Sequence, residues 1–245
     1  MGRPRVSLEV RELIATMAHD NPSWGAERIR GELLKLGIAV GRTSVQRYRR
    51  RGPARPPSQS WRTFLRNHRP SIWAVDLLTV QTVTFKTLYV LVFISHARRE
   101  LVHLNVVASP TAAWVWRQLI AATPWGRAPR YLVRDRDAVY GRGFGERARR
   151  LGIATLLTPV RAPRANAIAE RLVGTLRREC LDHLVVVNER HLRTILIEFV
   201  RFYNEQRPHR TLAMETPVPV VRATTGAIRA SPVLSGLHHV YERAA

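Results

Sequence analysis

The chain has 245 residues, of which 40 are Lys or Arg and 18 are Asp or Glu, so its formal net charge is +22. This balance excludes an ordinary metabolic enzyme and favours a polyanionic partner, most simply nucleic acid. The one cysteine, Cys180, excludes an intramolecular disulfide and a multi-cysteine zinc site. No stretch of about 18 uncharged apolar residues is present, so we expect no membrane span.

Three helices are predicted before residue 52. The first covers residues 8–19, the second begins after the Pro-Ser-Trp-Gly run at 22–25, and the third covers 45–51 with Thr43 or Ser44 as its cap. A glycine turn followed by a basic helix is typical of a helix-turn-helix module, whose second helix enters the major groove. A solvated cationic helix end is the simpler alternative. The candidate DNA-contacting side chains here are Gln46, Arg47, Arg50 and Arg51.

The central part of the chain predicts a mixed α/β sheet. Three apolar runs, at residues 72–78, 88–94 and 101–107, are joined by short connections, which predicts an antiparallel meander. Helical and extended patterns then alternate, so we expect further strands with helices on the faces of the sheet. The expected helices cover 110–122, 144–151, 165–180 and 190–204, and the expected strands 131–133 and 153–157. An extra strand is expected within 233–241.

Acidic residues are scarce, so their positions are informative. Asp76 interrupts an apolar strand, where a charge is costly unless it is paired or binds a cation. Asp135 follows the strand at 131–133, at the edge of the sheet where α/β proteins bind ligands. Glu170 falls in the first turns of the helix at 165–180. Three such carboxylates could meet at one point, and hard oxygen ligands suit Mg²⁺ or Mn²⁺. For Asp76 alone, a solvent-facing strand end is the simpler alternative.

Five sequence motifs occur in a recognisable order. Residues 73–76 (Trp-Ala-Val-Asp), 135–140 (Asp-Arg-Asp-Ala-Val-Tyr) and 163–171 (Pro-Arg-Ala-Asn-Ala-Ile-Ala-Glu-Arg) each contain one of the three acids. Residues 203–212 read Tyr-Asn-Glu-Gln-Arg-Pro-His-Arg-Thr-Leu, and residues 22–29 read Pro-Ser-Trp-Gly-Ala-Glu-Arg-Ile. With this set, the chain resembles bacterial insertion-sequence transposases with an integrase catalytic core, which are related to retroviral integrases.

The resemblance implies an Asp–Asp–Glu triad on a ribonuclease-H-like fold. Asp76, Asp135 and Glu170 are then the catalytic and metal-binding residues, and two Mg²⁺ (or Mn²⁺) ions about 3.5–4 Å apart would serve as cofactors. The implied reaction is metal-dependent DNA strand cleavage and strand transfer during transposition of a mobile element. The expected segments are a helix-turn-helix module (1–52), a linker (53–68), an integrase catalytic core (69–212) and a C-terminal extension (213–245).

The second acid departs from the usual motif. Relatives often have Asn-Gly after this acid, whereas this chain has Arg136 and Asp137. The interval from Asp135 to Glu170 is one residue shorter than the usual spacing, and the interval from Asp137 is shorter still. We therefore choose Asp135 and keep Asp137 as an alternative or supporting ligand.

Arginines surround the third acid. Gly174 and Arg177 follow Glu170 at i+4 and i+7 and share its helix face, so Arg177 could hold a DNA phosphate while Gly174 leaves room for the backbone. A solvated helix surface is the alternative. The candidate DNA-binding residues of this region are Arg161, Arg164, Arg177 and Arg178.

The expected partners are double-stranded DNA, both element ends and target, and further copies of the chain in a homo-oligomer on DNA. An upstream partner reading frame is possible, and no membrane partner is expected. Without the apolar core of a signal peptide, the predicted location is the bacterial cytoplasm, at the nucleoid. Two other functions remain open: a catalytically inactive transposase remnant that only binds DNA, and a ribonuclease-H-like nuclease that acts on RNA.

Overall fold

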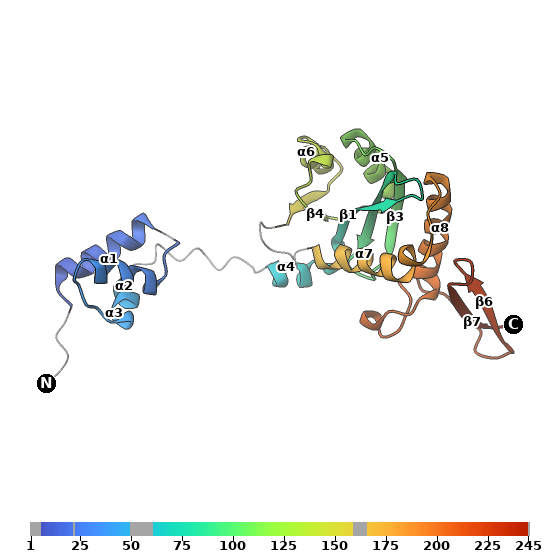
Figure 1. Cartoon of the computed structure of the whole chain (residues 1–245). Helices are drawn as coiled ribbons and strands as arrows, with labels where there is room; N and C mark the ends of the chain where they lie inside the picture. Colours follow the sequence, from blue (N-terminus) through green and yellow to red (C-terminus); the bar gives the residue numbers. More distant parts are fainter. Residues whose placement is uncertain (1–5, 22, 50–60, 159–165, 245) are drawn as a thin grey trace. The chain divides into compact units, whose positions relative to one another are not determined.

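The computed structural model describes residues 6–21, 23–49, 61–158 and 166–244. The chain divides into two units, residues 1–60 and 61–245, and each is described by itself (Figure 1).

The first unit is built from three helices, α1 (Leu8–Asp20), α2 (Ala26–Lys35) and α3 (Arg42–Tyr48). Apolar residues at helical spacing are fully buried between them: Ile14, Ile29, Leu33 and Val45. Helix α3 begins earlier than predicted, because Gly41 is its N-cap and neither Thr43 nor Ser44 caps it. Gln46 and Arg47 are exposed on α3, whereas Arg50 and Arg51 lie outside the described residues.

The second unit begins with a helix that was predicted as linker. Helix α4 (Trp61–Asn67) lies within the expected linker 53–68. Its residues Trp61, Phe64 and Leu65 pack against the core, and the ring of Phe64 lies 5.1 Å from that of Tyr131 between centroids.

A five-stranded mixed sheet forms the centre of this unit. Its strands, in the order β3-β2-β1-β4-β5, are Leu101–Val107, Thr87–Ser95, Ile72–Gln81, Tyr131–Arg134 and Ala154–Leu157. β1, β2 and β3 pair antiparallel, whereas β4 runs parallel to both β1 and β5. The predicted ribonuclease-H-like sheet, an antiparallel meander extended by parallel strands, is therefore confirmed.

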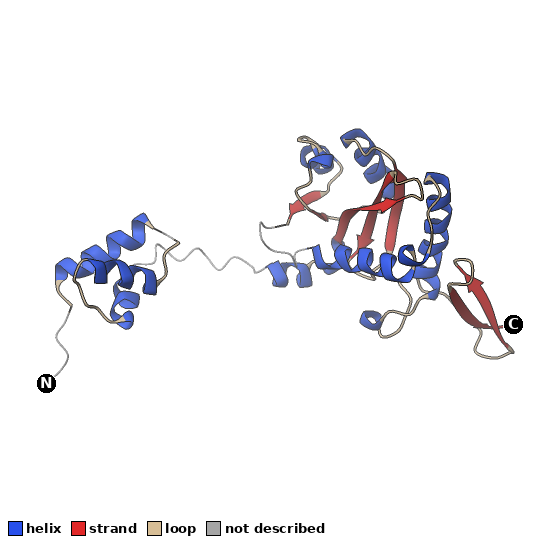
Figure 2. Ribbon diagram, in the orientation of Figure 1, coloured by secondary structure: helices blue, strands red, loops and turns tan. Residues whose placement is uncertain are grey.

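Helices cover both faces of the sheet (Figure 2). One core lies under α7 (Ala167–Glu179) and α8 (Glu189–Arg201), which continues as a π-helix, Phe202–Gln206. The other core lies under α5 (Ala112–Ala122) and α6 (Phe144–Arg150). Strand β1 alternates between the two cores, with Ala74 and Leu78 on the α7 side and Val75 on the α5 side. Cys180 is buried in the first core.

The C-terminal residues form a hairpin instead of one extra strand. β6 (Ile228–Val233) and β7 (His238–Arg243) pair antiparallel in a separate two-stranded sheet, so the predicted strand at 233–241 spans the turn. Leu234 in this turn and Val240 on β7 are buried in the core under α8. Across the described residues, no helix is both long and apolar enough to cross a membrane.

Candidate active site

Asp76 is on β1 at the point where this central strand meets β4. The register pairs Ile72 with Tyr131 and Ala74 with Val133, and the same register continued by two residues sets Asp76 opposite Asp135. Because side chains alternate along a strand, Asp76 shares the face of Ala74 on β1, whereas Asp135 follows β4 two residues after Val133. Both of these apolar residues belong to the core under α7. Asp76 therefore lies on the face of β1 that α7 covers, and Asp135 is the first residue after β4.

Glu170 is in the first turn of α7 and is exposed. The residue before this helix, Asn166, is 6% exposed and makes no side-chain cap. Instead its Nδ2 donates a hydrogen bond to the carbonyl oxygen of Val75 at 3.4 Å. The start of α7 is thereby attached to the residue that precedes Asp76. Sequence reasoning missed this role of Asn166, although a buried polar residue four positions before Glu170 was a usable signal.

The three carboxylates influence one another electrostatically. The pKa of Asp76 is raised from 3.8 to about 6, first because the side chain is largely buried and then because Asp135 and Glu170 are negatively charged. A hydrogen bond from the backbone N–H of Leu77 to Asp76 Oδ1, at 3.0 Å, opposes this shift. Repulsion among adjacent carboxylates is what a bound cation would relieve.

The set of side chains fits a hard divalent cation, although the site is not closed around one. All three candidate ligands offer carboxylate oxygens, which Mg²⁺ and Mn²⁺ prefer. In the described parts of the chain, no three His, Cys, Asp or Glu side chains stand close enough together to hold a metal ion as they are.

Asp137 has a structural task beside the site. It is the N-cap of a short 3-10 helix, Ala138–Tyr140, and its Oδ1 accepts a hydrogen bond from the N–H of Val139 at 2.8 Å. Its own N–H lies 3.3 Å from Asp135 Oδ1 and donates to it. Asp137 thus shapes the turn that holds Asp135, a role that the sequence motif did not reveal.

A buried tyrosine and arginine lie near the aspartates. Tyr140 is 1% exposed, and its hydroxyl has no hydrogen-bond partner in the described structure. Burial first, and then the charges of Asp135 and Asp76, raise the pKa of Tyr140 well above its ordinary value. The guanidinium of Arg134 lies 4.6 Å from the centroid of the Tyr140 ring, and its Nη1 donates to the Asp135 carbonyl at 3.0 Å.

The predicted DNA-binding arginines differ in their surroundings. Arg177 donates from Nη2 to the carbonyl of Thr79 at 3.0 Å, so it joins α7 to β1. Gly174 was predicted to leave room for DNA, but the guanidinium of Arg178 lies there: its Nη1 would be 2.9 Å from a Cβ at Gly174. Arg161 and Arg164 lie outside the described residues.

Residues 151–217 match the family model of the integrase core domain. The chain is 26% identical over 194 residues to an uncharacterized 39.2 kDa protein of insertion element IS476 from Xanthomonas euvesicatoria, which covers 78% of this chain and 56% of that protein. It is 24% identical over 147 residues to an uncharacterized 31.7 kDa protein of insertion element IS407 from Burkholderia multivorans, covering 60% of this chain and 53% of that protein. The chain thus spans about half the length of the relatives it matches.

One solved structure matches most of the chain. A chain in the cryo-EM structure of a simian T-cell lymphotropic virus intasome, in complex with the PP2A regulatory subunit B56 gamma, superposes with a TM-score of 0.52 at 13% identity. The match covers 94% of this chain and 87% of that chain. The fold is therefore ribonuclease-H-like, of the kind found in integrases. Together with the insertion-element relatives, it confirms the resemblance to bacterial insertion-sequence transposases with an integrase core.

Proposed function

We propose that the chain catalyses metal-dependent DNA strand cleavage and strand transfer for a mobile element. The observation that carries the proposal is the electrostatic grouping of Asp135 and Glu170 with the largely buried Asp76. These three acids come from β1, the end of β4 and the first turn of α7, and they occupy the motif positions of an Asp–Asp–Glu triad. In a chain of net charge +22, such a grouping needs a functional reason.

Asp76, Asp135 and Glu170 would hold two Mg²⁺ or Mn²⁺ ions. When bound, such ions activate the attacking oxygen and stabilise the leaving oxygen of an in-line displacement at phosphorus. Strand β1 carries Asp76, Asp135 directly follows β4, and the Asn166 hydrogen bond attaches the start of α7 to β1. This division suits phosphoryl transfer, where positioning and charge neutralisation supply most of the catalysis.

The DNA would be held by arginines of both units. Close to the triad, we assign this role to Arg161, Arg164, Arg177 and Arg178, and in the first unit to Gln46, Arg47, Arg50 and Arg51 of a helix-turn-helix module. The exposure of Gln46 and Arg47 on α3 supports this assignment. The proposed partners are element ends, target DNA and further copies of the chain, at the bacterial nucleoid in the cytoplasm.

The test is cleavage of supercoiled plasmid and of element-end duplexes in Mg²⁺ and Mn²⁺. We expect Asp76→Asn, Asp135→Asn and Glu170→Gln each to abolish nicking, while fluorescence anisotropy shows duplex binding within about twofold of wild type. Asp182→Asn, which removes an exposed acid after α7, is the matched control and should nick normally.

Two results would replace the proposal. If the wild-type chain binds element ends but never nicks them in either metal, the chain acts as an inactive remnant. If RNA in an RNA–DNA hybrid is cleaved in preference to duplex DNA, the substrate assignment is wrong. Full nicking by the three carboxylate variants would overturn the assignment of the triad itself.

A further inference from the structure

A second basic feature lies beside α7, apart from the three acids. It is a cavity of about 380 Å³ between α7, the connection from β2 to β3, and the segment that follows the π-helix. We name it the arginine cavity. Four arginines line it, together with the hydroxyl-bearing Tyr203 and Thr175: Arg99, Arg171, Arg207 and Arg210. None of the described residues that line the cavity is acidic.

The charges of this cavity are only partly balanced. Arg207 is neutralised, because its Nε and Nη2 donate to the two carboxylate oxygens of Glu179 at 2.6 Å each. Within the described residues, Arg99, Arg171 and Arg210 form no ion pair. Arg171 and Arg210 are exposed, whereas Arg99 is half-buried, so Arg99 is the arginine whose charge most lacks a negative partner.

Arg99 shows this imbalance most clearly. Its Nη1 is buried and has no hydrogen-bond partner in the described structure. The pKa of Arg99 is lowered from its ordinary value, first by burial and then by the positive charges of Arg69 and Arg171. Arg99 also has a left-handed backbone, with φ 62°, in the short connection from β2 to β3. A non-glycine residue rarely adopts this conformation, so the fold accepts some strain to keep an arginine here.

The wall opposite α7 is held by hydrogen bonds. The N–H of His209 donates to the Glu215 carbonyl at 3.0 Å, and the N–H of Met214 donates to the His209 carbonyl at 3.0 Å. Arg98, next to Arg99, donates from Nε to the Pro217 carbonyl at 2.8 Å. The segment that carries Arg210 is therefore tied to the connection that carries Arg99, and the cavity exists before any ligand arrives.

We propose that the arginine cavity is a binding site for a phosphate group, supplied by the DNA backbone. Guanidinium groups present paired N–H donors that match phosphate oxygens, and they remain charged in a partly buried site. The hydroxyl of Tyr203 lines the cavity and can add a donor, since a tyrosine is protonated at neutral pH.

The position of the cavity explains what such a contact would do. Arg171 directly follows Glu170 on α7, so a strand that crosses this helix can meet the acids on one side and the cavity on the other. The contact would then position the DNA relative to the triad without touching the reacting phosphate. This extends the proposed function, but it concerns binding alone and does not depend on cleavage.

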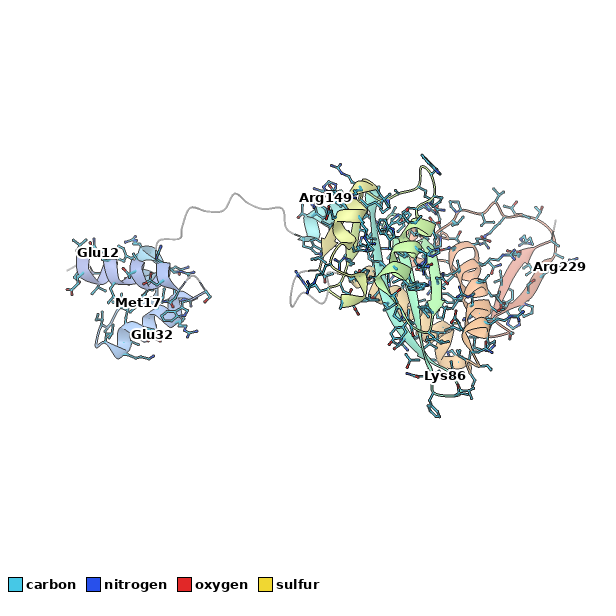
Figure 3. The ribbon with its side chains drawn as sticks, turned by 90° about the horizontal axis from the view of Figure 1, so that it is seen from above. Glu12, Met17, Glu32, Lys86, Arg149 and Arg229 are labelled. Atoms are coloured by element: carbon cyan, nitrogen blue, oxygen red, sulfur yellow. The ribbon has the colours of Figure 1, made fainter. Side chains whose placement is uncertain are left out.

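The main experiment compares Arg99→Gln/Arg171→Gln with a charge-matched control, Arg117→Gln/Arg149→Gln. The control arginines are exposed on α5 and α6, which cover the opposite face of the sheet, and Figure 3 shows Arg149 on α6 on the side of the unit away from Arg229 of the hairpin. Duplex affinity is measured by anisotropy at several KCl concentrations in EDTA. We expect the cavity variant to lose affinity on the order of tenfold and its salt slope to fall by about 1, and the control to change far less.

A second measurement identifies the source of the phosphate. Thermal unfolding is followed with inorganic phosphate against chloride at equal ionic strength. Loss of DNA affinity without stabilisation by phosphate supports a backbone phosphate. Stabilisation of the wild type but not of the cavity variant, with DNA affinity unchanged, supports a phosphate site for small ligands and overturns the DNA source.

The double variant could lose affinity because it folds poorly. A single change at an exposed residue of the cavity rim, Arg210→Gln, avoids this and should reproduce part of the loss of duplex affinity. The proposal is overturned if the cavity and control variants lose DNA affinity equally and phosphate stabilises neither protein more than the other. Duplex affinity is measured in EDTA and needs no cleavage. The binding result can therefore be interpreted even if the chain does not cleave DNA.

Discussion

Asn166 donates a hydrogen bond to the carbonyl of Val75 at 3.4 Å and so joins residues 91 positions apart in the chain. Val75 precedes Asp76 on β1, and Asn166 lies four residues before Glu170, so this bond connects the backbone positions of two of the three acids. The bond lies in a buried place, where its geometry is held by the packing around it. It is one of the contacts that place the helix of Glu170 against the strand of Asp76.

Replacement of Asn166 by Ala should therefore affect cleavage more than folding. We expect nicking to fall on the order of tenfold or more, because small misplacements of catalytic groups are costly, while unfolding free energy falls by about 1–2 kcal/mol. Plasmid nicking and urea unfolding measure the two effects. Asn188→Ala is the control, since Asn188 caps α8 by accepting from the His191 N–H at 2.9 Å. It should cost similar stability and leave nicking intact; equal losses of nicking in both variants would contradict the positioning role.

The raised pKa of Asp76 predicts that the unfolding free energy of the chain depends on pH. Its pKa in the folded chain is about 6, above the ordinary 3.8, so the folded state holds the proton more tightly than the unfolded state. The stability that this carboxyl contributes is fully present below about pH 4 and is lost as the pH rises through 6. In EDTA, Asp76→Asn should thus be more stable than wild type by roughly 3 kcal/mol at pH 7.5 and nearly equal to it at pH 4.

Urea unfolding at intervals from pH 4 to pH 8 measures this difference. The exposed Asp182→Asn variant is the control for the removal of a surface carboxylate. A difference between Asp76→Asn and wild type that stays constant across this range would show that burial and repulsion do not raise the Asp76 pKa.

Asp135 and Asp137 can be separated by one pair of variants. Asp137→Asn keeps an oxygen that can accept from the Val139 N–H, and Asn is as good a cap as Asp. We expect this variant to nick DNA within about threefold of wild type, whereas Asp135→Asn should be inactive. Asp137→Ala should lose about 1 kcal/mol of stability with the cap. If Asp137→Asn fails to nick DNA while Asp135→Asn nicks it, Asp137 is the second acid of the triad and Asp135 is not.

Local patterns predicted the strands, the helices and the three acids, because each depends on nearby residues. A continuous apolar run marks β1, and a lone carboxylate in that run is unusual enough to single out Asp76. Contacts between distant segments could not be predicted from local patterns. Helix α4 is stabilised by the ring of Phe64 against Tyr131, and the arginine cavity joins Arg99 to Arg171 from separate elements. The sequence also could not tell that Gly174 is covered by the neighbouring Arg178.

The motif at 203–212 has a structural reason that the sequence left open. Asn204 is 8% exposed, and its side-chain amide pairs with one backbone residue of the edge strand β3: Nδ2 donates to the Leu101 carbonyl and Oδ1 accepts from the Leu101 N–H, both at 2.9 Å. The amide thus takes the place of a neighbouring strand at the end of β3. This explains an asparagine at this position independently of DNA.

Asn204→Ala would leave both backbone groups of Leu101 without a partner in a buried place. We expect a loss of about 2–4 kcal/mol in the unfolding free energy, measured by urea denaturation. Asn204→Asp keeps the acceptor but loses the donor and buries a charge, so it should also be destabilised, and more at pH 7 than at pH 4. The exposed Asn67→Ala serves as control, with an expected change below about 0.5 kcal/mol. If Asn204→Ala unfolds like this control while DNA binding is lost, the motif serves DNA contact and its role at β3 is minor.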